Sequence, residues 1–149
     1  MGLALLAMAC RGTPGHLSEP GAPLAPCDRT VACVSTETSD SLYVMPPVPW
    51  GGQRREAQAI ARAALLAEPR LRITKDVPGY LRAEASSRIF HFVDDVEMVV
   101  DSTTMLFRFR SASRSGRRDR GAVRQRMERI SDRLRVGVGV SVPLDSAGH

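Results

Sequence analysis

The chain has 149 residues, of which 43% are hydrophobic and 25% are charged. This length and composition are typical of one globular domain with a tail, and they exclude repeat arrays and multidomain enzymes. The net charge of +5 is unevenly distributed. Residues 108–135 contain eleven arginines and three acidic residues, a local charge of +8, so the rest of the chain sums to −3. The basic character therefore belongs to one segment.

Residues 1–10 begin with an uncharged apolar run that ends at Cys10 and is too short to cross a bilayer as a helix. Small residues before a cysteine resemble the end of a bacterial lipoprotein signal, in which Cys10 would carry the lipid. We then expect a location in the cell envelope, on the periplasmic side of a bacterial membrane. No charged residue precedes the run, so the alternative is a chance apolar N-terminus and a cytoplasmic protein.

The three cysteines fit the same expectation. If Cys10 is lipidated, Cys27 and Cys33 remain as a local pair, which favours a short disulfide loop in an oxidising compartment. The alternative is three reduced thiols in the cytosol. Cys27 and Cys33 with His16 lack a fourth ligand at a zinc-like spacing, so we expect neither a metal nor a cofactor.

Prolines and glycines interrupt any helical or strand-like spacing of apolar residues in residues 11–26, which predicts a flexible linker. Residues 45–52, with three prolines, favour an extended backbone. Because Tyr43 and Trp50 flank the prolines, we expect a strap packed on the domain, with an exposed proline-rich ligand as the alternative.

Residues 53–68 carry alanine, isoleucine and leucine at helical spacing, and Pro69 marks the end of this predicted helix. Residues 72–76 and 80–87 flank a Val77-Pro78-Gly79 turn, in which proline presets φ and glycine accepts a positive φ. They predict a β-hairpin.

Residues 88–101 alternate with one apolar face, formed by Phe90, Phe92, Val96, Met98 and Val100. A turn at 101–104 with Ser102 and Thr103 at its tip would pair Val100 with Met105, Met98 with Phe107, and Val96 with Phe109. The same register pairs Glu97 with Arg108 and Asp95 with Arg110 on the other face. A slip by one residue would place charges against phenylalanines.

A second helix is predicted from an N-cap at Asp119 to about Arg135, with an apolar stripe of Val123, Met127, Ile130 and Leu134. Residues 136–149 follow as a tail or an edge strand, because residues 136–142 alternate with period two. The domain thus spans residues 27–135. Its predicted fold class is α+β, a four-stranded antiparallel sheet with two helices packed on one face.

The face of the sheet away from the helices is the candidate site. It would carry His91, Asp95, Glu97 and Arg110, with Arg114 beyond the strand end. Arginines near Ser111, Ser113 and a helix N-terminus can bind an anionic head through guanidinium, hydroxyl and backbone N–H donors. The alternative is a solvated face with cross-strand salt bridges.

These residues resemble a family of bacterial envelope and plastid proteins, the domain of unknown function 1499 family. The resemblance covers residues 27–134 and rests on Cys27, Cys33-Val-Ser35, Ser87-Arg-Ile-Phe-His-Phe-Val-Asp-Asp-Val-Glu97, Arg110-Ser-Ala-Ser-Arg114, Gly116, Asp119, Gly121, Arg124, Arg126 and Glu128. It implies an envelope or thylakoid-lumen location and no established activity. The loop between Cys27 and Cys33 lacks the family's prolines and asparagine. Arg117-Arg118 and Val123 replace a Tyr-Ser pair and an asparagine, which makes the site more cationic.

The first functional hypothesis is a non-enzymatic envelope domain that binds an anionic small molecule, a lipid or an envelope protein. Its ligand-binding residues would be Arg88, Asp94, Asp95, Glu97, Arg110, Ser111, Ser113 and Arg114, with the three acids orienting the arginines. A membrane contact would come through the lipid on Cys10.

Two alternatives belong to other classes of protein. One is a small hydrolase or isomerase with Asp94 or Asp95 as general base and His91 as acid. The other is a nucleic-acid-binding domain that uses residues 108–135. We do not expect nucleic acid as a partner, because export would remove the substrate and the segment matches no common nucleic-acid module.

Overall fold

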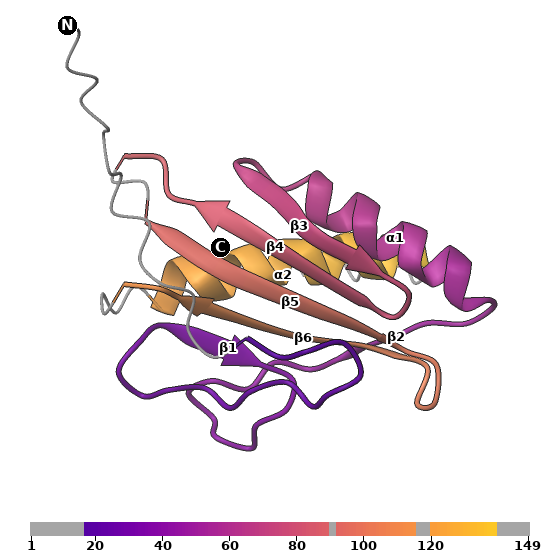
Figure 1. The fold of residues 1–149 in the computed structure, drawn as a ribbon, viewed down its shortest axis with the longest axis horizontal. Coiled ribbons are helices and arrows are strands. Elements are labelled where there is room, and N and C mark those ends of the chain that lie inside the picture. The colour runs from indigo at the N-terminus through magenta and orange to yellow at the C-terminus, as the bar shows by residue number, and fades with distance from the viewer. Residues whose placement is uncertain (1–16, 90–91, 116–119, 140–149) are drawn as a thin grey trace, which may run out of the picture.

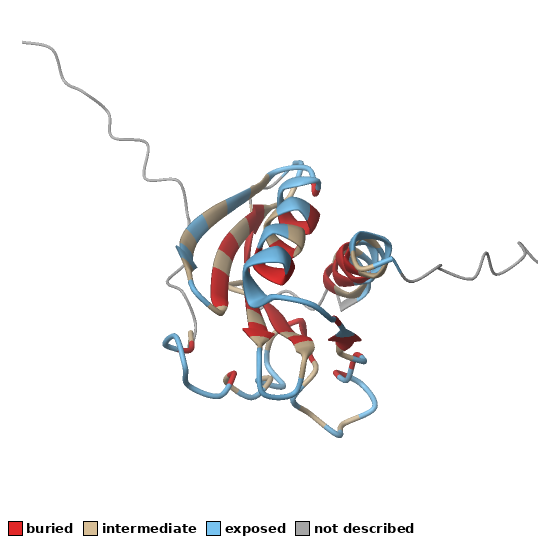
Figure 2. Cartoon of the chain, turned by 90° about the vertical axis from the view of Figure 1, so that its right-hand side faces the viewer, coloured by how far each residue is buried: buried red, intermediate tan, exposed pale blue. Residues whose placement is uncertain are grey.

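The computed structural model describes residues 17–89, 92–115 and 120–139. In chain order the elements are β1 (Cys33–Ser35), β2 (Val48–Pro49), α1 (Arg54–Leu66), β3 (Leu71–Val77), β4 (Tyr80–Ser86), β5 (Val93–Asp101), β6 (Leu106–Ser113) and α2 (Arg120–Gly137). The fold is α+β, as predicted, and both helices lie on one side of the sheet (Figures 1 and 2). None of the described helices is long and apolar enough to span a bilayer.

The sheet has six strands, so the prediction of four was wrong. Its order is β1-β6-β5-β4-β3, and β2 also pairs with β6. β1 pairs with the end of β6, with Val34 opposite Ser111, and β2 pairs with its start, with Val48 opposite Phe107. Strands of two and three residues are too short to show alternation in the sequence. The proline-rich strap of residues 45–52 thus packs on the domain, and the Trp50 ring lies 6.2 Å from that of Phe107.

The β5–β6 register is displaced by two residues from the predicted one. Val100 pairs with Phe107, and Met98 pairs with Phe109. The physical reason is a four-residue loop in place of a two-residue tip. Asp101 accepts hydrogen bonds from the backbone N–H groups of Thr103 and Thr104, and Met105 adopts a positive φ of 55°. A shift of two residues preserves which side chains share a face.

The helices and the predicted hairpin follow the sequence closely. The α2 stripe of Val123, Met127, Ile130 and Leu134 is buried in the core against the sheet. α2 continues through Val136 and Gly137, so these residues are helical and do not form an edge strand. Gly139, at a φ of 80°, donates its N–H to the carbonyl of Val136 and ends the helix. The predicted N-cap at Asp119 and residues 140–149 lie outside the described residues.

The face of the sheet away from the helices, called here the second face, is covered by the chain that precedes β1. Ser18 and Leu24 are buried there, and the Ser18 N–H donates to Glu97 Oε1 at 2.7 Å. The segment expected to be a linker therefore packs on the domain at Ser18 and Leu24, while residues 19–23 between them are exposed. Residues 11–16 lie outside the described part.

Candidate functional site

The eight predicted ligand-binding residues do not form one site. Strand alternation places Asp94, Ser111 and Ser113 on the face of the sheet that the helices cover, beside the apolar core residues of β5 and β6. It places four others on the second face: Asp95, Glu97, Arg110 and Arg114. Arg88 is exposed in the β4–β5 connection. The predicted residues are thus divided between the two faces of the sheet and the β4–β5 connection.

Glu97 lies at the centre of the second face, and it is fully buried. Its Oε1 accepts hydrogen bonds of 2.7 Å from both the Ser18 N–H and the Tyr80 hydroxyl, and Oε2 accepts from Arg110 Nη1 at 3.4 Å. Burial and the neighbouring Glu97 carboxylate raise the pKa of Tyr80, so this hydroxyl stays a donor. The predicted pairing of Glu97 with Arg108 was wrong. Arg108 instead forms ion pairs with Glu37 and Asp101.

Asp95 pairs with Arg114, and the predicted Asp95–Arg110 pair was wrong because the register moves Ala112 opposite Asp95. Arg114 Nε and Nη2 donate to the two Asp95 carboxylate oxygens at 2.8 and 2.6 Å. Arg114 Nη2 also donates to Glu84 at 2.8 Å. These hydrogen bonds, the one to Asp95 first, outweigh burial and raise the pKa of Arg114. Arg114 is therefore held by two carboxylates.

Arg110 borders a cavity of about 570 Å³ on the second face, called here the Arg110 cavity. Its other lining residues are Val31, Asp95, residues 25–28 and residues 112–114. The Arg110 side chain is 6% exposed, and its Nη1 and Nη2 contacts, to Glu97 and to the Pro26 carbonyl, are both 3.4 Å long. Its buried Nε has no hydrogen-bond partner in the described structure. The guanidinium is thus incompletely hydrogen-bonded.

The predicted disulfide between Cys27 and Cys33 is present. It ties the wall of the Arg110 cavity to β1, because Cys27 lines the cavity and Cys33 is buried in that strand. The carbonyl of Pro26, the next residue toward the N-terminus, accepts the long Arg110 contact. The disulfide therefore holds residues 26–28 over Arg110.

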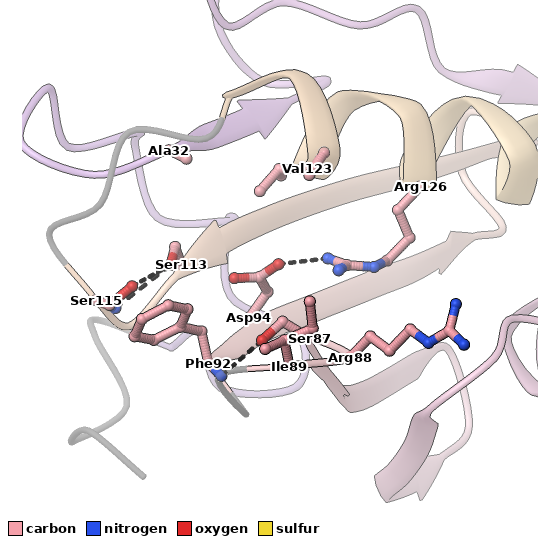
Figure 3. A pocket seen from close by; sticks show the side chains of 11 residues that line it. Ala32, Ser87, Arg88, Ile89, Phe92, Asp94, Ser113, Ser115, Val123 and Arg126 are labelled. Atoms are coloured by element: carbon pink, nitrogen blue, oxygen red, sulfur yellow. Dashed lines mark hydrogen bonds and ion pairs between the residues drawn. The ribbon is translucent and has the colours of Figure 1, made fainter. Parts of the chain in front are cut away.

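A second cavity, of about 320 Å³, lies on the helix face where β5 meets the beginning of α2; it is called here the helix-side cavity. Figure 3 shows Asp94 and Arg126 pointing toward each other in it, with 2.5 Å between Asp94 Oδ2 and Arg126 Nη1. Arg126 was missed as a site residue. Asp94 alternates in step with Val96 and Met98 of β5, so the sequence indicates that it faces the helices. The sequence does not show which helical residue contacts it.

The serines contribute less than predicted. Ser111 is fully buried opposite Val96, and its hydroxyl has no partner among the described residues. Ser113 borders both cavities, and its hydroxyl lies 3.1 Å from that of Ser115. Only Ser113 is therefore placed where it could touch a bound molecule.

Of the residues proposed for acid–base catalysis, the structure describes only Asp94 and Asp95. Asp94 and Asp95 lie on opposite faces of β5, and each is the partner of an arginine. His91 and Cys10 lie outside the described residues. Within the described residues, no three His, Cys, Asp or Glu side chains are grouped as a metal site would require. The predicted catalytic pair of Asp94 or Asp95 with His91 stays a prediction, because His91 is outside the described part of the chain.

The arginines of the basic segment are largely engaged. Of those with described side chains, Arg124 donates to the carbonyls of Leu42 and Val44. The others form ion pairs: Arg108, Arg110, Arg114, Arg126, Arg129, Arg133 and Arg135. The charge of this segment is therefore largely matched by acidic partners within the domain.

Comparison with known proteins gives one finding. No curated protein and no solved structure matches the chain. A family model, described as a protein of unknown function (DUF1499), matches residues 23–134, which is most of the chain and includes both cavities. With its α+β sheet, its disulfide and the paired acidic and basic residues of β5 and β6, the chain belongs to the DUF1499 family.

Proposed function

We propose that this domain is a non-enzymatic binding protein of the cell envelope that takes a small anionic ligand in the Arg110 cavity. The disulfide supports an oxidising compartment, since such bonds are rare in the cytosol. A lipid on Cys10 would attach the domain to the membrane. Mass analysis of the mature protein should find diacylglyceryl-Cys10 at the N-terminus. An intact Met1 would refute the anchor.

The state of the Arg110 guanidinium carries this proposal. An arginine has five N–H donors, and a buried unpaired donor is costly. Arg110 meets its carboxylate partner only at 3.4 Å, while that carboxylate already accepts two shorter hydrogen bonds on its other oxygen. A carboxylate or phosphate in the adjoining cavity would supply acceptors for the uncommitted N–H groups through the planar fork of the guanidinium.

The neighbouring charges define the kind of anion. Asp95 and Glu84 form ion pairs with Arg114 and Arg72, two cations for two carboxylates, so they do not repel an anion as free carboxylates would. Asp28, also on the cavity wall, accepts hydrogen bonds from Thr30. The cavity of about 570 Å³ lies within the size range of small-molecule sites. We therefore expect a compact organic phosphate or carboxylate.

A thermal-shift comparison tests this function. Phosphate and a panel of small dicarboxylates and organic phosphates should stabilise the wild-type domain, and Arg110→Gln should weaken the affinity by about tenfold or more. Arg110→Lys is the companion variant, because it retains a cation beside Glu97 but lacks the fork. It should fold and lose most of the ligand effect.

Arg135→Gln is the matched control. It removes the same charge from a partly exposed pair with Asp132 near the end of α2. It should respond to the anions as the wild type does. Equal anion responses in wild type, Arg110→Lys and Arg110→Gln would contradict the assignment of the ligand to Arg110.

A further inference from the structure

We propose that the helix-side cavity is a second binding site, which takes an amphiphile with one acyl chain and an anionic head. The site lies on the opposite face of the sheet from the Arg110 cavity, and the two share only Ser113 among their lining residues. It rests on different residues from those of the proposed function.

The polar end of the cavity is the Asp94–Arg126 pair. Both side chains are largely buried, at 12% and 11% exposure. Among the described residues, Asp94 is the only hydrogen-bond partner of the Arg126 guanidinium. It accepts from Nη1, so within this part of the chain the N–H groups of Nε and Nη2 have no acceptor. An anionic oxygen entering the cavity can accept them.

Hydroxyl groups lie beside this pair. Ser87 Oγ accepts a hydrogen bond from the Phe92 N–H at 2.9 Å, which leaves its own proton available as a donor. Ser113 and Ser115 also line the cavity, on the other side of Asp94 from Arg126 (Figure 3). A head group with two or more oxygens would therefore find several donors.

The remaining walls are apolar. Ala32 comes from the segment before β1, Val123 from α2, and Phe92 and Ile89 from the β4–β5 connection. Ile89 is 75% exposed, an unusual position for a large aliphatic side chain. An apolar chain that covers Ile89 and Phe92 would remove this surface from water.

The charged residues that line the cavity favour an anionic head group. The charged side chains of the described residues that border the cavity are Arg88, Asp94 and Arg126, which sum to +1. The Asp94 carboxylate already accepts a hydrogen bond from the Arg126 guanidinium. A ligand anion therefore competes with Asp94 for the same guanidinium, which predicts opposite effects from removing the two partners.

Binding of monomeric dodecanoate to the full chain, measured by calorimetry, tests the site. Arg126→Gln should weaken binding by about tenfold or more, because it removes the donor of a charge-assisted hydrogen bond. Asp94→Asn should tighten binding severalfold, because it removes the competing carboxylate. Arg135→Gln, a partly exposed arginine of the same helix, should bind as the wild type does.

Several outcomes would overturn the proposal: no dodecanoate binding by the wild type, equal binding by both variants, or weaker binding by a folded Asp94→Asn variant. A second experiment distinguishes the two sources of the amphiphile. The protein is mixed with vesicles of phosphatidylglycerol that contain labelled lysophosphatidylglycerol. Transfer of the labelled lipid to the protein identifies a membrane source, and binding of dodecanoate alone identifies a free fatty carboxylate. Arg110→Lys should leave both results unchanged, so failure here is distinct from failure of the proposed function.

Discussion

Two buried glutamates each join parts of the chain that are distant in sequence. Glu97 joins β5 to Ser18 and Tyr80. Glu68, just after α1, accepts hydrogen bonds from Arg129 and Arg133 of α2. Removing one partner of a buried ion pair leaves an unpaired charge, which destabilises a fold far more than losing an exposed pair. These two residues are therefore expected to tolerate substitution poorly.

Glu68 should make stability depend on acid pH. Burial alone would raise the pKa of Glu68, but hydrogen bonds from Arg129 and Arg133 outweigh it and lower that pKa. A lowered folded-state pKa adds stability above the unfolded value of about 4.3, and this stability is lost as pH falls through the folded pKa. The difference in unfolding free energy between wild type and Glu68→Gln should thus shrink below about pH 4.

Chemical denaturation at pH values from about 7 to about 2.5 measures this difference. Glu128→Gln is the control, because Glu128 is exposed on α2, the helix that carries Arg129 and Arg133, and this variant should differ little from wild type at any pH. A gap between wild type and Glu68→Gln that stayed constant with pH would show that Glu68 does not contribute through its charge.

The long helices and strands could be predicted from the sequence, and the two shortest strands could not. The two helices and the β3–β4 hairpin follow from apolar spacing and from the Pro78-Gly79 turn. The β5–β6 faces follow from alternation, but their register depends on an Asp101 loop whose hydrogen bonds the pattern does not show. β1 and β2 are held by pairing with β6, a long-range effect that leaves no local signal.

The segment before β1 leads to a prediction about folding. A chain that begins at residue 27 lacks the Ser18 N–H that donates to Glu97 and the buried side chain of Leu24. It should be less stable than a chain that begins at residue 17 by about 3 kcal/mol, the sum of one charge-assisted hydrogen bond and one buried leucine. Urea denaturation of both chains measures the difference. Coincident unfolding curves would show that residues 17–26 do not stabilise the domain.

For the molecule as a whole, the local charge of +8 is less available than the sequence suggests. The described arginines of residues 108–135 are engaged with acidic side chains or backbone carbonyls. Most of the acidic partners lie elsewhere in the chain, which explains why that remainder is acidic. We therefore propose that anions bind at the two cavities rather than over a general basic surface.

The site could be predicted only in part. The residue types and the acidic–basic pairing between β5 and β6 are visible in the sequence, and alternation already implies that Ser111 faces away from Arg110. The sequence does not reveal that residues 25–28 form the wall of the Arg110 cavity. It also does not reveal that Arg126 meets Asp94, because both contacts depend on how the elements pack.

The anion site at Arg110 is tested most directly by an NMR titration of the isotope-labelled wild-type domain with phosphate and with a small dicarboxylate. We predict saturable chemical-shift changes of the backbone amides at Arg110, Ala112 and residues 27–28, which surround the Arg110 cavity. Saturation would indicate one defined site. Changes that rise linearly with anion concentration and spread over the exposed arginines would contradict an anion site at Arg110.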